Sequence, residues 1–173
     1  MVLNGLWLVV ARFGPLWSTV LVIVLLLAVL ARVIVLLGRA PARGWAERIV
    51  VDGTNGLHFG WVTIATVANT AAWLTATVPE SWAEQADLWA ILVLAAVLLI
   101  GVATAWFTVR IAPALATAWG LVWLAVGRLT DEPQSTPTAI AAIIVAVVIV
   151  LAAGVAVMRK LRTSPVAEPG ART

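Results

Sequence analysis

Long runs of apolar residues, separated by short polar or charged segments, dominate the chain. A helix needs about 20 consecutive apolar residues to cross a bilayer, and these runs are continuous rather than alternating, which favours helices over strands. We therefore predict an all-α, polytopic transmembrane bundle that forms a single domain over residues 1–158. Its five spans are expected near residues 14–37, 56–78, 88–109, 111–127 and 138–158, after a short apolar helical stub at 2–11.

The division between the third and fourth spans depends on a single charge. Only Arg110 interrupts the apolar run between residues 88 and 127. Pro113 follows closely, and proline is tolerated in the first turn of a helix because the N–H that it lacks would have no partner there. The sequence favours two helices in this region, with one long bent helix as the alternative.

The composition excludes an ordinary soluble domain. Of the 173 residues, 63% are hydrophobic and only 11% are charged, which is roughly half of the charged fraction of a soluble domain. A soluble fold needs more polar surface, whereas a bilayer needs an apolar exterior and internally satisfied backbone groups. A transmembrane β-barrel would show short alternating segments instead. The lipid bilayer is therefore the expected surrounding.

The basic residues are divided unequally between the two sides that alternating spans define. The first side carries eight of them: Arg39, Arg43, Arg48, Arg110, Arg159, Lys160, Arg162 and Arg172. The other side has only Arg12 and Arg128, with most of the carboxylates. Because cytoplasmic loops are enriched in Lys and Arg, we expect a plasma-membrane protein with a cytoplasmic C-terminus and a disordered basic tail at 159–173. No patch combines basic and aromatic residues, so no nucleic-acid partner is expected.

The first span allows further interpretations. Residues 1–42 could be a secretory signal that ends at Ala40-Pro41-Ala42, although the apolar run is too long for one and Arg32 lies inside it. Arg32 could also bind an anionic propionate group. We favour a helix that begins near Phe13 and ends at Arg32, whose side chain reaches the cytoplasmic headgroups while residues 33–37 lie in the interface.

The sequence gives no basis for catalysis. The chain has no cysteine, which excludes disulfides, thiolate catalysis and Cys-based metal sites. The carboxylates lie in loops, and neither a Ser-His-Asp arrangement, nor His/Glu metal spacing, nor a Gly-rich phosphate loop is visible. We therefore expect that the protein is not an enzyme.

The second span carries the most informative polar and aromatic residues. At 100° per residue, one sector of about 80° contains His58, Trp61, Ala65, Ala68, Asn69 and Ala72, and Trp73 borders it. Small residues beside Trp and Asn allow close helix approach and supply an aromatic wall and an amide. We expect this face to contact a partner helix or a ligand. The opposite face is expected to contact lipid and comprises Thr63, Ile64, Val67, Thr70, Ala71 and Leu74.

The spacing of these residues resembles a known family. Trp-x3-Ala-Thr-x2-Asn-x3-Trp, here Trp61, Ala65, Thr66, Asn69 and Trp73, is similar to the last core helix of the tryptophan-rich sensory (TspO/peripheral benzodiazepine receptor) superfamily. A weaker match is Leu3-Asn4-Gly5-Leu6-Trp7, which resembles the Asn-x2-Trp element of that family's third helix. The three extra spans after residue 78 resemble the longer bacterial branch.

The resemblance implies a binding function. In the family, the Trp and Asn side chains line a cavity for flat hydrophobic ligands such as porphyrin or haem, and the protein acts as a sensor or regulator. The implied ligand-binding residues are Asn4, Trp7, His58, Trp61, Ala65, Asn69 and Trp73, with no certain cofactor and no metal site. The chain has no counterpart of the family's first two helices, so the expected cavity lacks a wall. We favour a truncated start as the reason; alternatively, a second copy in a homo-oligomer or another polypeptide supplies this wall.

Three alternatives stay open at this point. The same face could pack against partner helices, or the protein could transport small molecules, without any tetrapyrrole ligand. His58 could ligate haem iron or bond a porphyrin carboxylate, but an interfacial position with neither role is favoured. Trp119 and Trp123, four residues apart, could stack on a flat ligand, although packing or an interfacial belt is favoured.

Overall fold

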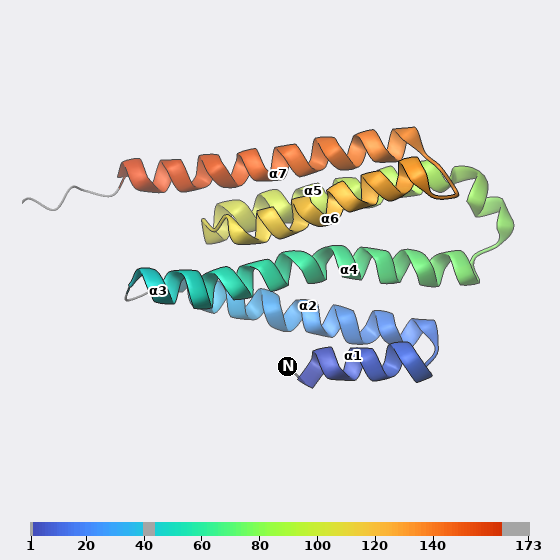
Figure 1. The fold of residues 1–173 in the computed structure, drawn as a ribbon, viewed down its shortest axis with the longest axis horizontal. Helices are drawn as coiled ribbons and strands as arrows, with labels where there is room; N and C mark the ends of the chain where they lie inside the picture. The colour runs from blue at the N-terminus through green and yellow to red at the C-terminus, as the bar shows by residue number, and fades with distance from the viewer. Residues whose placement is uncertain (1, 40–43, 164–173) are drawn as a thin grey trace, which may run out of the picture.

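The computed structural model describes residues 2–39 and 44–163, and these form an antiparallel bundle of helices (Figure 1). The described part contains no strand, so the all-α prediction is confirmed. The long helices are α1 (Val2–Phe13), α2 (Leu16–Arg39), α4 (Thr54–Thr77), α5 (Ala86–Thr108), α6 (Ala112–Thr130) and α7 (Thr136–Thr163). Three short elements join them: α3 (Trp45–Glu47), the π-helix η1 (Arg48–Gly53) and the 3₁₀-helix η2 (Glu80–Gln85).

The helices have the length and composition of membrane spans. In the part of the chain that the structure describes, α2, α5, α6 and α7 are long and apolar enough to cross a bilayer, so the protein is an integral membrane protein. The remaining predicted span, α4, has 24 residues like α2 but carries more Thr, Asn and Gly. It lies between α2 and α6 (Figure 1), where neighbouring helices cover its polar groups.

Two apolar clusters form the interior, one on each side of α4. The first cluster joins α2 and α4 through Ile23, Leu26, Leu30, Ile34, Phe59 and Val62, with Leu3 and Trp7 of α1 packed against it. The second cluster joins α5, α6 and α7, and contains Leu121, Ala142, Ile149 and Ala153, which are almost completely buried. Helix α4 therefore connects an α1–α2 half of the molecule to an α5–α7 half.

Glycine brings α4 and α6 into close contact. A Cβ added at Gly60 would lie 2.3 Å from the Pro113 carbonyl oxygen, and one at Gly56 would lie 2.9 Å from the Pro113 Cδ. In the other direction, a Cβ at Gly120 would lie 2.9 Å from Ile64 Cγ2. Small residues at four-residue spacing allow helix backbones to approach in this way, which maximises van der Waals contact in a lipid environment.

The lipid-facing side that we predicted for α4 is therefore wrong over its first half. Thr63 is only 5% exposed, Ile64 contacts Gly120 of α6, and Val67 packs against the α5–α7 cluster. The prediction failed because it treated the second span by itself, whereas α6 returns along this face. A helix that is covered on two sides has no single lipid-facing stripe.

The region between residues 88 and 127 forms two helices rather than one bent helix. Helix α5 ends at Thr108. The next residue, Val109, has the left-handed values φ 52° and ψ 43°, and its N–H donates a hydrogen bond to the Ala105 carbonyl. A left-handed residue is a common helix terminator, but it is strained for a β-branched side chain. Pro113 lies in the first turn of α6, as the sequence predicted.

Arg110 lies in the turn between α5 and α6, and its side chain connects this turn to α2 and to the π-helix η1. Its Nη2 donates a hydrogen bond of 2.7 Å to the Leu37 carbonyl near the end of α2, and its Nη1 forms an ion pair with Asp52 of the π-helix. Both side chains are mostly buried, with 13% and 16% exposed. The Leu37 carbonyl belongs to the last turn of α2, where carbonyls have no intrahelical donor. Arg110 thus links the two halves of the bundle at one end.

The end of α2 also differs from the prediction. The helix does not end at Arg32 but continues to Arg39, because residues 33–37 are apolar and Ile34 is buried in the α2–α4 cluster. Arg32 itself is exposed on the outer face. The proposed cleavage site at 40–42 and most of the predicted basic tail lie outside the described residues.

Candidate ligand-binding face

Two hydrogen bonds between α1 and α4 bring four of the predicted site residues together. The Asn4 Nδ2 lies 3.2 Å from the His58 Nε2, and the Trp7 Nε1 donates to the Asn69 Oδ1 over 3.3 Å. All four side chains are partly buried. Polar side chains are costly in a membrane unless they pair or face a cavity, and here they pair across a helix interface.

Helical periodicity explains why two residues of α1 reach two distant residues of α4. His58 and Asn69 are separated by three turns, so they lie within about 20° of each other around the helix axis. Asn4 and Trp7 are neighbours on one face of α1, as residues i and i+3. The long indole of Trp7 reaches Asn69, while the shorter Asn4 reaches His58. Asn4, Trp7, His58 and Asn69 therefore lie along one contact between the two helices, which we call the α1–α4 polar seam.

The hydrogen bonds also define the orientation of the seam groups. The Asn69 Nδ2 donates to the Ala65 carbonyl of its own helix at 2.9 Å, which leaves its Oδ1 to accept from Trp7. Since the indole N–H can only donate, this amide orientation follows from the contacts. Asn4 donates to His58, so the His58 Nε2 acts as an acceptor in this arrangement.

The other three predicted site residues lie around the seam in different environments. Trp61, one turn from His58, has 52% of its surface exposed. Ala65 packs against the α2–α4 cluster, and Trp73, one turn beyond Asn69, is partly buried. Neither the Trp61 indole nor the Trp73 indole makes a hydrogen bond or ring contact with another described residue. The seven residues thus form a polar seam flanked by an open indole face.

The remaining candidates of the sequence lie elsewhere. Trp119 and Trp123 form an edge-to-face pair on α6, with ring centroids 5.8 Å apart, and both are more than half exposed. They lie on a different helix from the seam. Over residues 2–39 and 44–163, no group of three or more His, Asp and Glu side chains could hold a metal ion.

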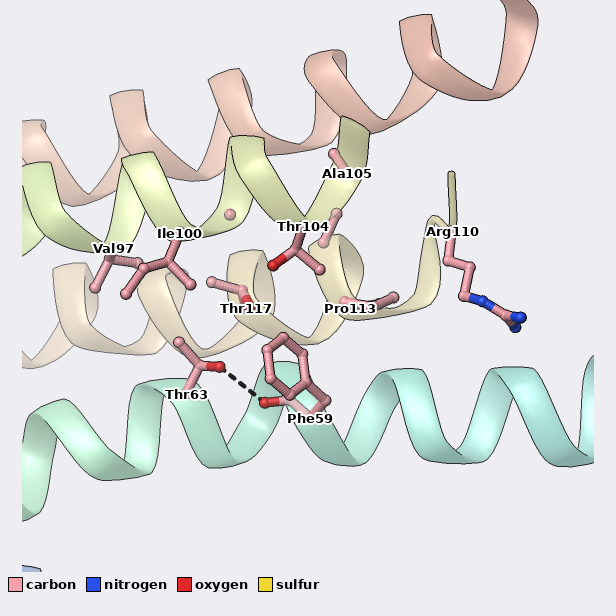
Figure 2. A pocket seen from close by; sticks show the side chains of 11 residues that line it. Phe59, Thr63, Val97, Ile100, Thr104, Ala105, Arg110, Pro113 and Thr117 are labelled. Atoms are coloured by element: carbon pink, nitrogen blue, oxygen red, sulfur yellow. Dashed lines mark hydrogen bonds between the residues drawn. The ribbon is translucent and has the colours of Figure 1, made fainter. Parts of the chain in front are cut away.

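A small, partly open cavity lies on the opposite side of α4, and sequence reasoning missed it. Its volume is about 10 Å³, and its lining includes Phe59 and Thr63 of α4, Thr104 of α5, and Pro113 and Thr117 of α6 (Figure 2). The sequence pattern predicted that Thr63 faces lipid. Threonine is common in membrane helices, so no pattern within one span could have shown that three helices would turn these hydroxyls toward each other.

Comparison with known proteins gives one result. The profile of a family described as TSPO-like protein matches residues 1–155, which include α1 to α6 and most of α7. No curated protein and no solved structure matches the chain. The match covers the α1–α4 polar seam and the three later helices alike, and it confirms the resemblance that Trp61, Asn69 and Trp73 indicated.

Proposed function

Because this chain belongs to the TSPO-like family, we propose that its α1–α4 polar seam and the adjoining Trp61 face bind a flat hydrophobic ligand, such as porphyrin or haem. The observation that carries the proposal is the pair of bonds that aligns Asn4 with His58 and Trp7 with Asn69 beside a half-exposed indole. A flat apolar ring would stack on Trp61. The seam would supply hydrogen bonds for its polar edge.

In this proposal the protein is a sensor or regulator and not an enzyme. Ligand contact with Asn69 or His58 competes with the existing bonds to α1, so occupancy would change how α1 is held against α4. A binding event coupled to a helix contact is a physical basis for signalling. His58 is the described residue whose side chain best fits haem iron, because a neutral imidazole nitrogen is a metal ligand.

The proposal is tested by titrating the detergent-purified protein with protoporphyrin IX and following tryptophan quenching together with porphyrin absorbance. We expect saturable binding that Trp61→Ala and Asn69→Ala each weaken. Trp123→Ala is the matched control, since Trp123 is 56% exposed against 52% for Trp61 but lies on α6. Linear quenching that is the same in all four proteins would refute the proposal.

Haem and iron-free porphyrin separate the two roles of His58. If His58 ligates iron, His58→Ala weakens haem binding and shifts the haem absorbance but leaves protoporphyrin IX binding unchanged. If His58 bonds a carboxylate, the substitution weakens both ligands equally. If wild type and His58→Ala bind both ligands with equal affinity, His58 is not part of the binding site.

A packing role is the second candidate, and a specific observation favours it. The seam groups already satisfy each other, as expected for polar contacts that hold membrane helices together, and the exposed Trp61 face could then bury itself against another helix, in a second copy or another protein. This candidate, like a transport role without a tetrapyrrole, predicts that Trp61→Ala changes assembly or stability but no porphyrin affinity. Size-exclusion chromatography with light scattering tests this.

We further propose that the protein lies in the bacterial plasma membrane with its C-terminus in the cytoplasm. The ends of α2, α5 and α7 lie at one end of the bundle (Figure 1), where the Arg159 guanidinium lies 5.1 Å from the Trp106 ring centroid. The chain contains no cysteine, so single cysteines report topology directly. A membrane-impermeant maleimide should label Asp131→Cys on intact cells and label Thr163→Cys only after lysis. The reverse pattern would invert the orientation.

A further inference from the structure

The small cavity beside α4 is lined by one threonine from each of three helices. Thr63 belongs to α4, Thr104 to α5 and Thr117 to α6, and Figure 2 shows the Thr104 and Thr117 side chains directed into the space above Thr63. Thr63 and Thr117 are only 5% and 4% exposed. Burying a hydroxyl group destabilises the folded protein unless the group forms a hydrogen bond. Thr104 is only partly buried, so this cost applies in full to Thr63 and Thr117 and in part to Thr104.

The two buried hydroxyls use their protons within the protein. Thr63 Oγ1 donates to the Phe59 carbonyl at 2.9 Å, and Thr117 Oγ1 donates across the helix interface to the Gly60 carbonyl at 3.3 Å. A hydroxyl has one donor and two acceptor lone pairs, so both oxygens can still accept. Thr104 has no side-chain hydrogen bond to any residue that the structure describes, and its donor is available.

The cavity has room for one water molecule. It measures about 10 Å³, and a site of roughly 10–15 Å³ with two to four polar partners is what a buried water requires. This volume excludes an organic ligand. Phe59 and Val97 make part of the wall apolar, and the stem of Arg110 adjoins one end while its guanidinium points away from the threonines (Figure 2).

We propose that this cavity is a binding site for a single structural water molecule. The water accepts a hydrogen bond from Thr104, whose hydroxyl has no other partner among the described residues, and donates to the free lone pairs of Thr63 and Thr117. The water then joins α5 to α4 and α6 where their backbones make few direct contacts, and it connects the two halves of the bundle. This site lies on the face of α4 opposite Trp61 and does not depend on ligand binding there.

The substitution Thr104→Val tests the proposal through the sign of a stability change. Valine has the shape of threonine but cannot donate a hydrogen bond. If the water is present, removing its donor lowers the melting temperature in detergent, by about 2–4 °C. If the cavity is dry, Thr104→Val removes an unsatisfied hydroxyl and leaves the melting temperature unchanged or raises it, and the proposal is overturned.

Thr19→Val is the matched control for this experiment. Thr19 is 4% exposed, but its hydroxyl bonds to the Leu16 carbonyl of its own helix at 2.7 Å, away from the cavity. Since such a local bond contributes little, we expect a smaller change than for Thr104→Val. A decrease as large as that of Thr104→Val would show that loss of any buried hydroxyl has this effect, and would count against the water.

A direct measurement on the wild-type protein makes the test independent of how the variants fold. With methyl-labelled threonine in detergent, NMR should show cross-relaxation from water to the Thr104 and Thr117 methyl groups and none to Thr19. Absence of these signals at Thr104 and Thr117 would overturn the proposal, whatever the variants show.

Discussion

Adding one methyl group at Gly60 tests whether close contact between α4 and α6 holds the two halves together. The Cβ of Gly60→Ala would lie 2.3 Å from the Pro113 carbonyl oxygen and 2.9 Å from the Ala116 Cβ. An ordinary carbon–oxygen contact is about 3.3 Å or longer. The atoms in the way belong to backbone and to a short side chain, so they cannot rotate aside. The helices must therefore separate by about 1 Å.

The energetic cost follows from three contributions. Forced overpacking costs about 1–3 kcal/mol, and we expect the upper end because the obstacle is rigid. Separation also weakens the Thr117–Gly60 hydrogen bond, which contributes about 0.5–1.5 kcal/mol. In the opposite direction, alanine in place of glycine stabilises the helix by about 1 kcal/mol through its higher helix propensity. The net destabilisation is about 3 kcal/mol, which corresponds to a melting temperature lower by about 6–12 °C.

Gly154→Ala is the control that isolates the contact. Gly154 also lies within a helix, α7, but a Cβ there would meet no atom within 4 Å. This variant should gain the helix propensity alone and melt about 2–4 °C higher than wild type. Thermal unfolding in detergent, followed by circular dichroism, compares the three proteins. If Gly60→Ala were as stable as Gly154→Ala, the close α4–α6 contact would be absent from the native state.

Two further predictions concern contacts between helices. Arg110→Ala should lower the free energy of unfolding by about 2–4 kcal/mol, because it leaves Asp52 mostly buried without its cation; thermal unfolding measures this, and wild-type stability would refute the link. Trp7→Phe and Asn69→Ala should each remove the same hydrogen bond, so a double-mutant cycle should give a coupling of about 0.5–1.5 kcal/mol. Additive effects would show that the bond does not form.

The sequence by itself determined that this protein lies in a lipid bilayer and that it is built from helices. Continuous apolar runs leave few conformations other than helices in a bilayer, and single breakers such as Pro113 marked where one helix ended and the next began. Trp61, Asn69 and Trp73 at helical spacing were enough to indicate the family. Even the weak Asn4 and Trp7 signal located a segment that contacts the second span.

Only the tertiary structure decided what each face of a helix contacts. The sequence could place His58 and Asn69 on one face of α4, but not show that Asn4 and Trp7 would bond to them. The sequence also predicted that Thr63 faces lipid, because the pattern of a single helix does not show whether one of its faces meets lipid or another helix. In a membrane the hydrophobic effect does not distinguish these two surroundings, and helix packing depends on the fit between specific side chains of separate segments.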